Sequence, residues 1–273
     1  MRALTFLLAV NACHPAVQRA QTGDTAARII SLSPAATDTL VELGAGAHLV
    51  AIGRYGDLPP GRDLPRVGGL HDPNLEAIKA LRPTLIVTTG AKHNGALDKL
   101  GIRVLRLAEG NLDSVLANPL ILGNAVGFSE AGSALSERLK AATKPSLLES
   151  KTDTVLLVFS RQGEPVNRAW AAGPSGWLGG LMRAAGLRNV LRKGAPFVEL
   201  SAEAIVALAP ARIIEVHADP AQAPSPAEAQ HAWAGLKPVP AVRDERISVL
   251  TGGSLLRPGP SMTDTVRRLR QLE

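Results

Sequence analysis

The sequence predicts an α/β protein with two similar lobes, mainly parallel sheets, and one long backbone helix that joins the lobes. Short runs of β-branched residues alternate with helical patterns, which is typical of parallel sheets covered by helices. A segment of the first half also recurs in the second half. With 273 residues, 45% of them hydrophobic, the chain is long enough to bury one large core or two modest ones.

The first 27 residues have the pattern of an export leader followed by a linker. A short positive start precedes an apolar run over 3–12, which is too short to span a bilayer and is typical of a signal-peptide core. The run leads to Cys13 through a small residue, as in a lipoprotein box, so lipidation of Cys13 is one expected outcome. Cleavage near 25–27 to a soluble form and an unprocessed cytosolic end are the alternatives.

The N-terminal lobe is expected over 28–112. Pro34 ends its first strand, Gly44 ends the helix that follows, and Pro83 halts a second helix capped by Asp72 or Asn74. The expected strands are 28–33, 49–52, 85–88 and 102–107, and the expected helices are 37–43 and 74–81.

The C-terminal lobe is expected over 151–273, with strands at 154–159 and 247–250 and a helix over 176–185. Residues 74–87 align without gaps on residues 201–214, and seven of the fourteen positions are identical. The matches include Glu-x-Ile and Leu-x-Pro-x-x-Ile at the same spacing. A period this long excludes a solenoid and predicts two equivalent lobes.

The connecting helix is expected over 113–150, where the sequence has no strand pattern. Ser129 can cap a helix with its apolar residues on one face. Pro119 and Pro145 conflict with a continuous helix, because each should kink or end a helix that contains it.

The sequence gives little support for catalysis, metal binding or nucleic-acid binding. The chain has no nucleophile elbow, no H-E-x-x-H motif and no P-loop. Its net charge of +6 is spread thinly and only eight residues are aromatic, so a nucleic-acid groove is not expected. Its single cysteine excludes a Cys-rich zinc site. Of the six histidines, His71, His93 and His217 lie near expected strand ends, where a metal site would need further ligands such as Glu215 and Asp219.

Four residues are candidates for the wall of a cleft between the lobes, since open parallel sheets bind ligands beyond their strand ends. Tyr55, the only tyrosine, stands in a loop rich in Gly and Pro. Phe159 lies at a strand end and Phe197 in the loop before the second Glu-x-Ile helix. Arg257 offers a positive charge to a carboxylate or a phosphate. Tyr55 and Arg257 also have simpler interpretations, as an aromatic that plugs the lobe and as a solvated charge.

Four segments together resemble the periplasmic binding proteins with a helical backbone that serve ABC importers. They are RIISLSPAATDTLVELGAGAHLVAIGRY, PRVGGLHDPNLEAIKALRPTLIV, LSAEAIVALAPARII and RPGPSMTDTVRRL, and they cover about 28 to 270. Within this superfamily the cobalamin receptors are the most similar subgroup. The resemblance implies two α/β lobes, one long joining helix, a ligand in the cleft and limited hinge motion.

The resemblance also implies roles for particular residues. Glu76 and Glu203, the pair that the repeat singles out, match glutamates that bind arginines on the two permease subunits. The cleft of the cobalamin receptors is matched at Tyr55, Phe159, Phe197 and Arg257. At Leu70 and Thr89 the best-known pattern has tryptophans, so part of the aromatic wall is replaced.

These expectations define an exported, monomeric binding protein without catalytic residues, resident metal or cofactor. It captures a corrinoid (cobalamin-like) ligand and delivers it to an ABC importer permease dimer; it contacts the membrane only through lipid at Cys13. A ferric siderophore or haem receptor is the alternative. Arg54, Lys92 and Arg257 are the basic residues expected to bind an anionic siderophore, and His71 is the candidate axial ligand of a haem iron. Outside the class of binding proteins, the alternative function is that of a secreted metal-dependent enzyme.

Overall fold

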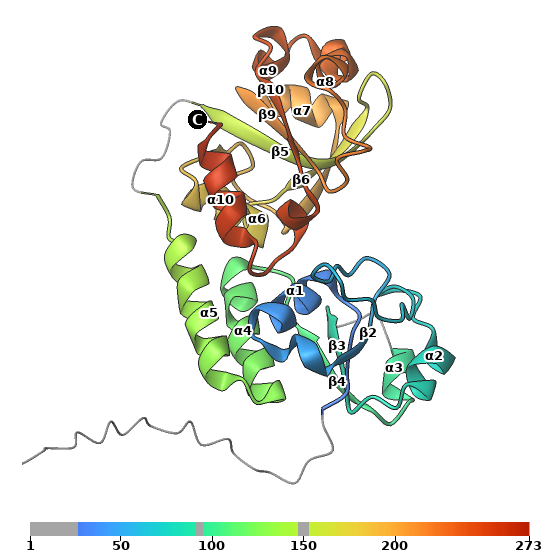
Figure 1. The fold of residues 1–273 in the computed structure, drawn as a ribbon. Helices are drawn as coiled ribbons and strands as arrows, with labels where there is room; N and C mark the ends of the chain where they lie inside the picture. Colours follow the sequence, from blue (N-terminus) through green and yellow to red (C-terminus); the bar gives the residue numbers. More distant parts are fainter. Residues whose placement is uncertain (1–26, 91–94, 147–152, 273) are drawn as a thin grey trace, which may run out of the picture.

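A computed structural model describes residues 27–90, 95–146 and 153–272, and it contains two α/β lobes stacked end to end (Figure 1). The N-terminal lobe is built on a parallel sheet in the order β2-β1-β3-β4. Its strands are β1 (Ile29–Ser31), β2 (Leu49–Ile52), β3 (Leu85–Thr89) and β4 (Arg103–Leu107). These strands agree with the predicted ones.

The C-terminal lobe is built on a mixed sheet in the order β10-β9-β5-β6-β8, with the short strand β7 beside β5. Strands β10, β9, β5 and β7 run parallel, whereas β6 is antiparallel to both β5 and β8. The strands are β5 (Thr154–Gln162), β6 (Arg168–Ala172), β7 (Arg188–Asn189), β8 (Phe197–Ser201), β9 (Arg212–His217) and β10 (Ile247–Thr251). The antiparallel strands β6 and β8 were not predicted.

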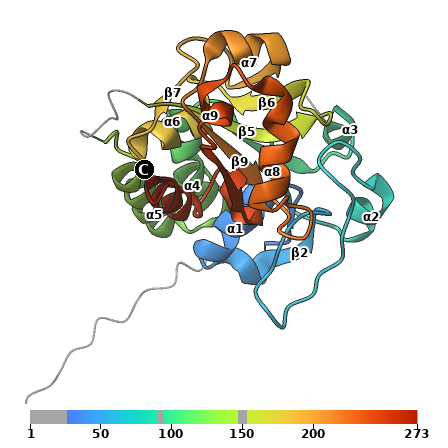
Figure 2. The ribbon, with the colours of Figure 1, turned by 90° about the horizontal axis from the view of Figure 1, so that it is seen from above.

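Helices cover both faces of the N-terminal sheet because successive residues of β1 point to opposite sides. Ile29 packs in the cluster that includes α1 and α4, whereas Ile30 packs with Ile78 and Leu97 from α2 and α3. Figure 2, seen from above, shows α4 and α5 on one side of the molecule and α2 and α3 on the other. The helices of this lobe are α1 (Pro34–Glu42), α2 (Leu75–Ala80) and α3 (Gly95–Asp98).

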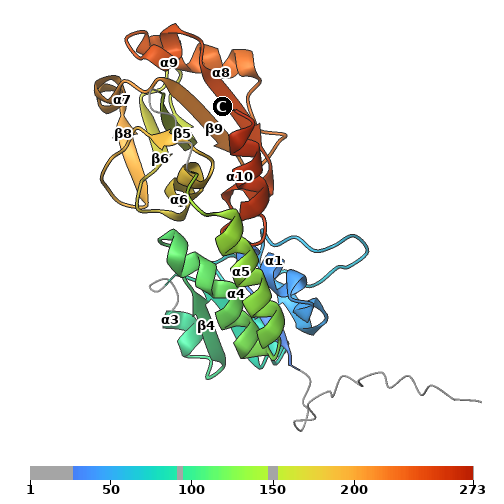
Figure 3. The same ribbon diagram turned by 90° about the vertical axis from the view of Figure 1, so that its left-hand side faces the viewer.

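The connecting segment forms two helices instead of one long helix. α4 (Leu112–Val126) and α5 (Ser129–Ala142) lie side by side (Figure 3), and both contact the C-terminal lobe, α4 at helix α6 (Trp177–Ala184) and α5 at helix α10 (Met262–Arg270). The break is at Gly127, whose φ of 84° lies in the left-handed region that glycine adopts without strain. Pro119 is tolerated inside α4, and Pro145 follows the end of α5.

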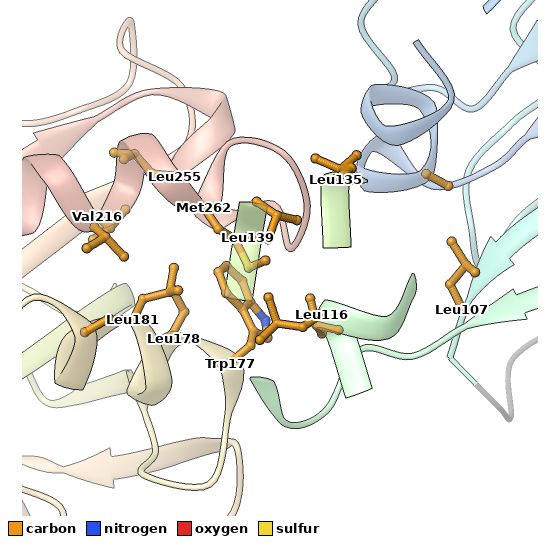
Figure 4. Packing of buried hydrophobic residues seen from close by; sticks show 14 of the residues in the cluster. Leu107, Leu116, Leu135, Leu139, Trp177, Leu178, Leu181, Val216, Leu255 and Met262 are labelled. Carbon is orange, nitrogen blue, oxygen red and sulfur yellow. The ribbon is translucent and has the colours of Figure 1, made fainter. Parts of the chain in front are cut away.

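The remaining helices belong to the C-terminal lobe. They are α6 (Trp177–Ala184), α7 (Ala202–Leu208), α8 (Pro226–Trp233), α9 (Pro240–Arg243) and α10 (Met262–Arg270). The largest hydrophobic cluster crosses from one lobe to the other, and Figure 4 shows Trp177 of α6 among leucines of α4 and α5. No helix within the described ranges is long and apolar enough to cross a membrane.

The predicted internal repeat is visible in the structure. Helix α2 leads into β3 as helix α7 leads into β9. Even the turns between them agree, because Arg82 and Ala209, at matching positions of the repeat, have φ values of 45° and 46°. Few non-glycine residues adopt this left-handed conformation, so the shared strain supports the equivalence of the two units.

Candidate ligand-binding cleft

The first part of the cleft is a pocket of about 470 Å³ that both lobes line. The N-terminal lobe supplies Arg54 and Tyr55 from the loop after β2. The C-terminal lobe supplies Leu256, the last residue of the 3₁₀-helix η3 (Gly253–Leu256), and Arg257, which follows it. Tyr55 is 67% exposed, which is unusual for so large a ring. Its ring is available to a ligand and does not plug the lobe.

The second part is an apolar pocket of about 270 Å³ around two phenylalanines. Phe159 and Phe197 meet edge to face, with ring centroids 5.4 Å apart. Phe197, expected in a loop, is the first residue of β8 and is 39% exposed. Leu256 lines this pocket as well as the first, so the two adjoin and carry aromatic rings from opposite lobes.

Arg257 lies in the cleft, where two carboxylates of the N-terminal lobe hold its guanidinium. Its Nη2 donates to Asp57 Oδ2 at 2.5 Å and its Nη1 to Asp38 Oδ2 at 3.3 Å. Burial raises the pKa of Asp38, although the guanidinium opposes this shift. Burial also lowers the pKa of Arg257, but its bond to Asp57 and the charge of Asp38 outweigh this and the net pKa is raised. The arginine therefore ties the lobes together across the cleft.

The other arginines of the first pocket also have partners within the protein. Arg54 Nη2 donates to Asp72 Oδ2 at 2.5 Å, and its hydrogen bond lowers the pKa of that carboxyl. Arg66 Nη1 donates to three backbone carbonyls, those of Gly53, Arg54 and Gly56. In the described part of the cleft, the arginines thus bind carboxylates and backbone carbonyls of the protein itself.

Two predicted ligand residues lie outside these pockets. Leu70 is half-buried in a bend, and Thr89 is buried as the last residue of β3. Neither is among the described residues that line the two pockets. The siderophore candidate Lys92 and His93 lie outside the described residues, as does Cys13.

Glu76 and Glu203 occupy equivalent places on the two lobes. Each is the second residue of a short helix, α2 or α7, and each is exposed. Asn74 caps the first helix and Ser201 the second, through side-chain oxygens that accept backbone N–H groups. The Ser201 hydroxyl also lowers the pKa of Glu203, which keeps that carboxylate charged. The cleft and these two surface carboxylates are separate features.

The polar residues near the strand ends do not assemble a metal site. Among residues 27–90, 95–146 and 153–272, no group of three or more His, Cys, Asp or Glu side chains is placed to hold a metal ion. His217 is hydrogen-bonded to Glu215, with Nε2 2.9 Å from Oε2, whereas His71 and Asp219 are exposed.

Several residues that shape the cleft carried no signal in the sequence. Leu256 joins the two pockets, and Asp38 and Asp57 fix the predicted arginine. These carboxylates are 219 and 200 positions away from Arg257 in the chain. Only the fold brings such distant positions together, so a single sequence does not reveal them.

Comparisons with known proteins agree with this architecture. Residues 29–252 match the family described as periplasmic binding protein. The vitamin B12-binding protein of Vibrio cholerae serotype O1 is 25% identical over 251 residues, covering 89% of this chain and 88% of the relative.

Two solved structures share the fold. The periplasmic heme-binding protein HutB of Vibrio cholerae superposes with a TM-score of 0.75 at 20% identity, covering 90% of this chain and 98% of that one. The periplasmic vitamin B12-binding protein BtuF of Vibrio cholerae gives 0.71 at 23% identity, with 90% and 95% covered. With its match over most of its length, the chain belongs to the periplasmic binding protein family and is an extracytoplasmic substrate-binding protein of the ABC importer type.

Proposed function

We propose that this protein captures a corrinoid in the cleft between its lobes and delivers it to the permease of an ABC importer. The observation that carries the proposal is the pair of aromatic walls, Tyr55 on the N-terminal lobe and Phe159 with Phe197 on the C-terminal lobe. A broad, partly apolar macrocycle is the kind of ligand that such walls bury. The vitamin B12-binding relative supports the same ligand class.

The charges of the cleft favour a ligand without strong negative charge. Arg257, Arg54 and Arg66 are all engaged by carboxylates or backbone carbonyls of the protein. An anionic ferric siderophore or a haem with two propionates would have to break these pairs, and breaking a partly buried pair leaves a charge uncompensated. A corrinoid whose side chains are neutral amides needs no such exchange.

Calorimetric titration of the purified protein tests the proposal. We expect cyanocobalamin to bind one-to-one with a Kd below about 1 μM, which corresponds to about 8 kcal/mol. Haemin and a ferric hydroxamate, titrated in parallel, should bind at least about tenfold more weakly. Tighter binding of either iron chelate would transfer the assignment to the haem or siderophore receptors.

We also propose that Glu76 and Glu203 dock the protein on the permease dimer, one glutamate to each permease subunit. Two equivalent carboxylates on equivalent lobes suit a symmetric partner. The double variant E76K/E203K should lose ligand uptake while its affinity for the ligand stays unchanged. Glu130→Lys is the matched control, because Glu130 is also exposed in the first turn of a helix. Normal uptake by the double variant would refute this docking role.

Lipidation of Cys13 is the proposed membrane attachment, and the sequence motif is its support. The protein expressed with its leader should partition into detergent, and Cys13→Ser should abolish that partition. Equal partition of the two forms would exclude the anchor.

A further inference from the structure

A polar pocket of about 540 Å³ opens in the C-terminal lobe beside the cleft. It lies where β5 and β9 end, and Phe159 belongs both to it and to the apolar pocket. On its other side, Ala218 and Asp219 directly follow its wall residue His217 and line the pocket of Tyr55. The polar pocket is therefore a side arm of the same cleft. Its lining is Phe159, Ser160, Arg161, Glu164, His217, Ala221, Gln222, Ala223, Pro224 and Glu228.

A buried carboxylate organises the floor of this pocket. Glu215 is only 1% exposed, and Arg161 Nε donates to its Oε1 at 2.8 Å. Trp233 Nε1 donates to the same oxygen at 2.5 Å. Such a fully partnered carboxylate holds its donors in one orientation, so Arg161 and His217 present fixed faces to the pocket.

The orientation of His217 leaves one ring nitrogen for a ligand. Its Nε2 lies 2.9 Å from Glu215 Oε2, and a carboxylate oxygen only accepts, so Nε2 donates. In the neutral ring the other nitrogen, Nδ1, is then a hydrogen-bond acceptor. The imidazole is 24% exposed and lines the pocket. A ligand N–H group can meet it there without displacing a protein contact.

The charges around the pocket disfavour anions. Glu164 and Glu228 lie in the lining and Glu215 lies beneath it, whereas Arg161 is the one guanidinium among the described lining residues. The backbone N–H of Ser225 lowers the pKa of Glu228, which keeps this carboxyl ionised. Burying a further carboxylate among these groups costs free energy, whereas a neutral polar group is accepted.

We propose that this side arm is a subsite for the carboxamide side chains of the ligand, and that it selects amidated corrinoids against those with free carboxylates. The inference rests on the proposed function, and the carboxamides are the part of the ligand that this pocket would recognise. A carboxamide carries both a C=O acceptor and N–H donors without net charge. The carbonyl accepts from Arg161 and the N–H₂ donates to His217 Nδ1 or to the Glu164 carboxylate.

The first test compares two corrinoids that differ in these side chains. Dicyanocobinamide carries carboxamides, whereas cobyrinic acid carries carboxylates on the same macrocycle. We expect cobyrinic acid to bind at least about 100-fold more weakly in calorimetric titration, because its carboxylates meet Glu164 and Glu228. Equal affinities would overturn the inference but not the proposed function, whereas failure of dicyanocobinamide and cyanocobalamin alike would overturn both.

Two variants assign the selectivity to this pocket. Glu164→Lys should improve the binding of cobyrinic acid about tenfold or more, because it replaces repulsion by attraction. Glu245→Lys is the matched control, because it makes the same charge change on an exposed residue of the same lobe. Glu245 lies just before the start of β10, whereas the pocket lies at the other end of the parallel strands. His217→Phe should weaken dicyanocobinamide about tenfold, with little effect on cobyrinic acid. Thermal unfolding checks that each variant is folded, and an unchanged ratio of affinities in Glu164→Lys would overturn the inference.

Discussion

At the scale of residues, the cleft depends on aromatic rings that the fold leaves exposed. Phe197 is 39% exposed at the start of β8, which is an edge strand of the C-terminal sheet. Its edge-to-face contact with Phe159 holds the ring in place before any ligand arrives. Because this ordering is made within the protein, less conformational entropy is lost when a ligand packs on the ring.

Phe197→Ala therefore separates binding from stability. We expect the affinity for cyanocobalamin, measured by calorimetric titration, to fall about tenfold or more, because the ligand loses an apolar contact. The melting temperature should change little, since the exposed ring buries only part of its area in the protein. Leu200 lies in the same strand but is buried, so Leu200→Ala is the contrasting variant that should lower the melting temperature.

Asp38 provides a prediction about pH. Burial raises its pKa above the ordinary value of 3.8, so the folded protein holds this proton more tightly than the unfolded chain does. The contribution of Asp38 to the free energy of unfolding is thus greatest below that value and declines as pH rises through the folded pKa. Relative to the non-ionising variant Asp38→Asn, the wild type should lose melting temperature as pH rises from below 3.8 through the folded pKa of Asp38.

Asp72→Asn is the opposite case. The hydrogen bond from Arg54 lowers the pKa of Asp72, so the stability that this carboxylate contributes is fully present above the ordinary value of 3.8 and is lost as pH falls through the lower folded pKa. Relative to Asp72→Asn, the melting temperature of the wild type should therefore fall on acidification below 3.8. The effect should be small because both groups are exposed to solvent. Identical pH trends for the two variants would contradict this account.

At the scale of elements, the α4–α5 hairpin depends on two glycines that let the helices approach closely. A Cβ on Gly123 would lie 2.6 Å from the backbone oxygen of Phe128 and 3.0 Å from Gly132 Cα. A Cβ on Gly132 would lie 2.6 Å from the backbone oxygen of Pro119. These contacts involve backbone atoms of both helices, so no side-chain rotation relieves them.

Gly123→Ala should lower the free energy of unfolding by about 2 kcal/mol, measured by urea denaturation. Gly110→Ala is the control, because nothing lies within 4 Å of a Cβ at that position. Equal stability of the two variants would show that the helices separate without cost.

The elements also show how far the sequence alone leads. The strands β1 to β5, β10 and the repeated helices were predictable because apolar runs and Gly or Pro boundaries mark them. Strands β6 and β8 were not, since Trp170 and Phe197 are exposed and neither segment has a clean alternation. The helix break at Gly127 was not predicted because the segment has no strand pattern and a single glycine is compatible with a continuous helix. For the cleft, the sequence and resemblance located Tyr55, Phe159 and Phe197, but not the carboxylates that hold Arg257.

At the scale of the whole molecule, the lobes share one hydrophobic core. The cluster around Trp177 contains Leu107 and Leu116 from the N-terminal side and Leu255 and Met262 from the C-terminal side. Trp177 also donates its backbone N–H to the carbonyl of Gly110. Contacts of this kind couple the unfolding of the two lobes.

Calorimetry should accordingly record a single thermal transition with equal calorimetric and van't Hoff enthalpies. Trp177→Ala should lower the free energy of unfolding by about 4 kcal/mol, because it leaves a large cavity in the shared core. Two resolved transitions in the wild type would mean that the lobes unfold independently.

The bond of Arg257 to two carboxylates of the opposite lobe has a kinetic consequence. Together with α5 it joins the lobes at a second place, so the mouth of the cleft has its width before the ligand enters. Association should then be a single step whose observed rate rises linearly with ligand concentration, without a plateau set by prior opening. By microscopic reversibility the ligand leaves through the same mouth, so dissociation should be a single exponential without a lag for opening of the lobes.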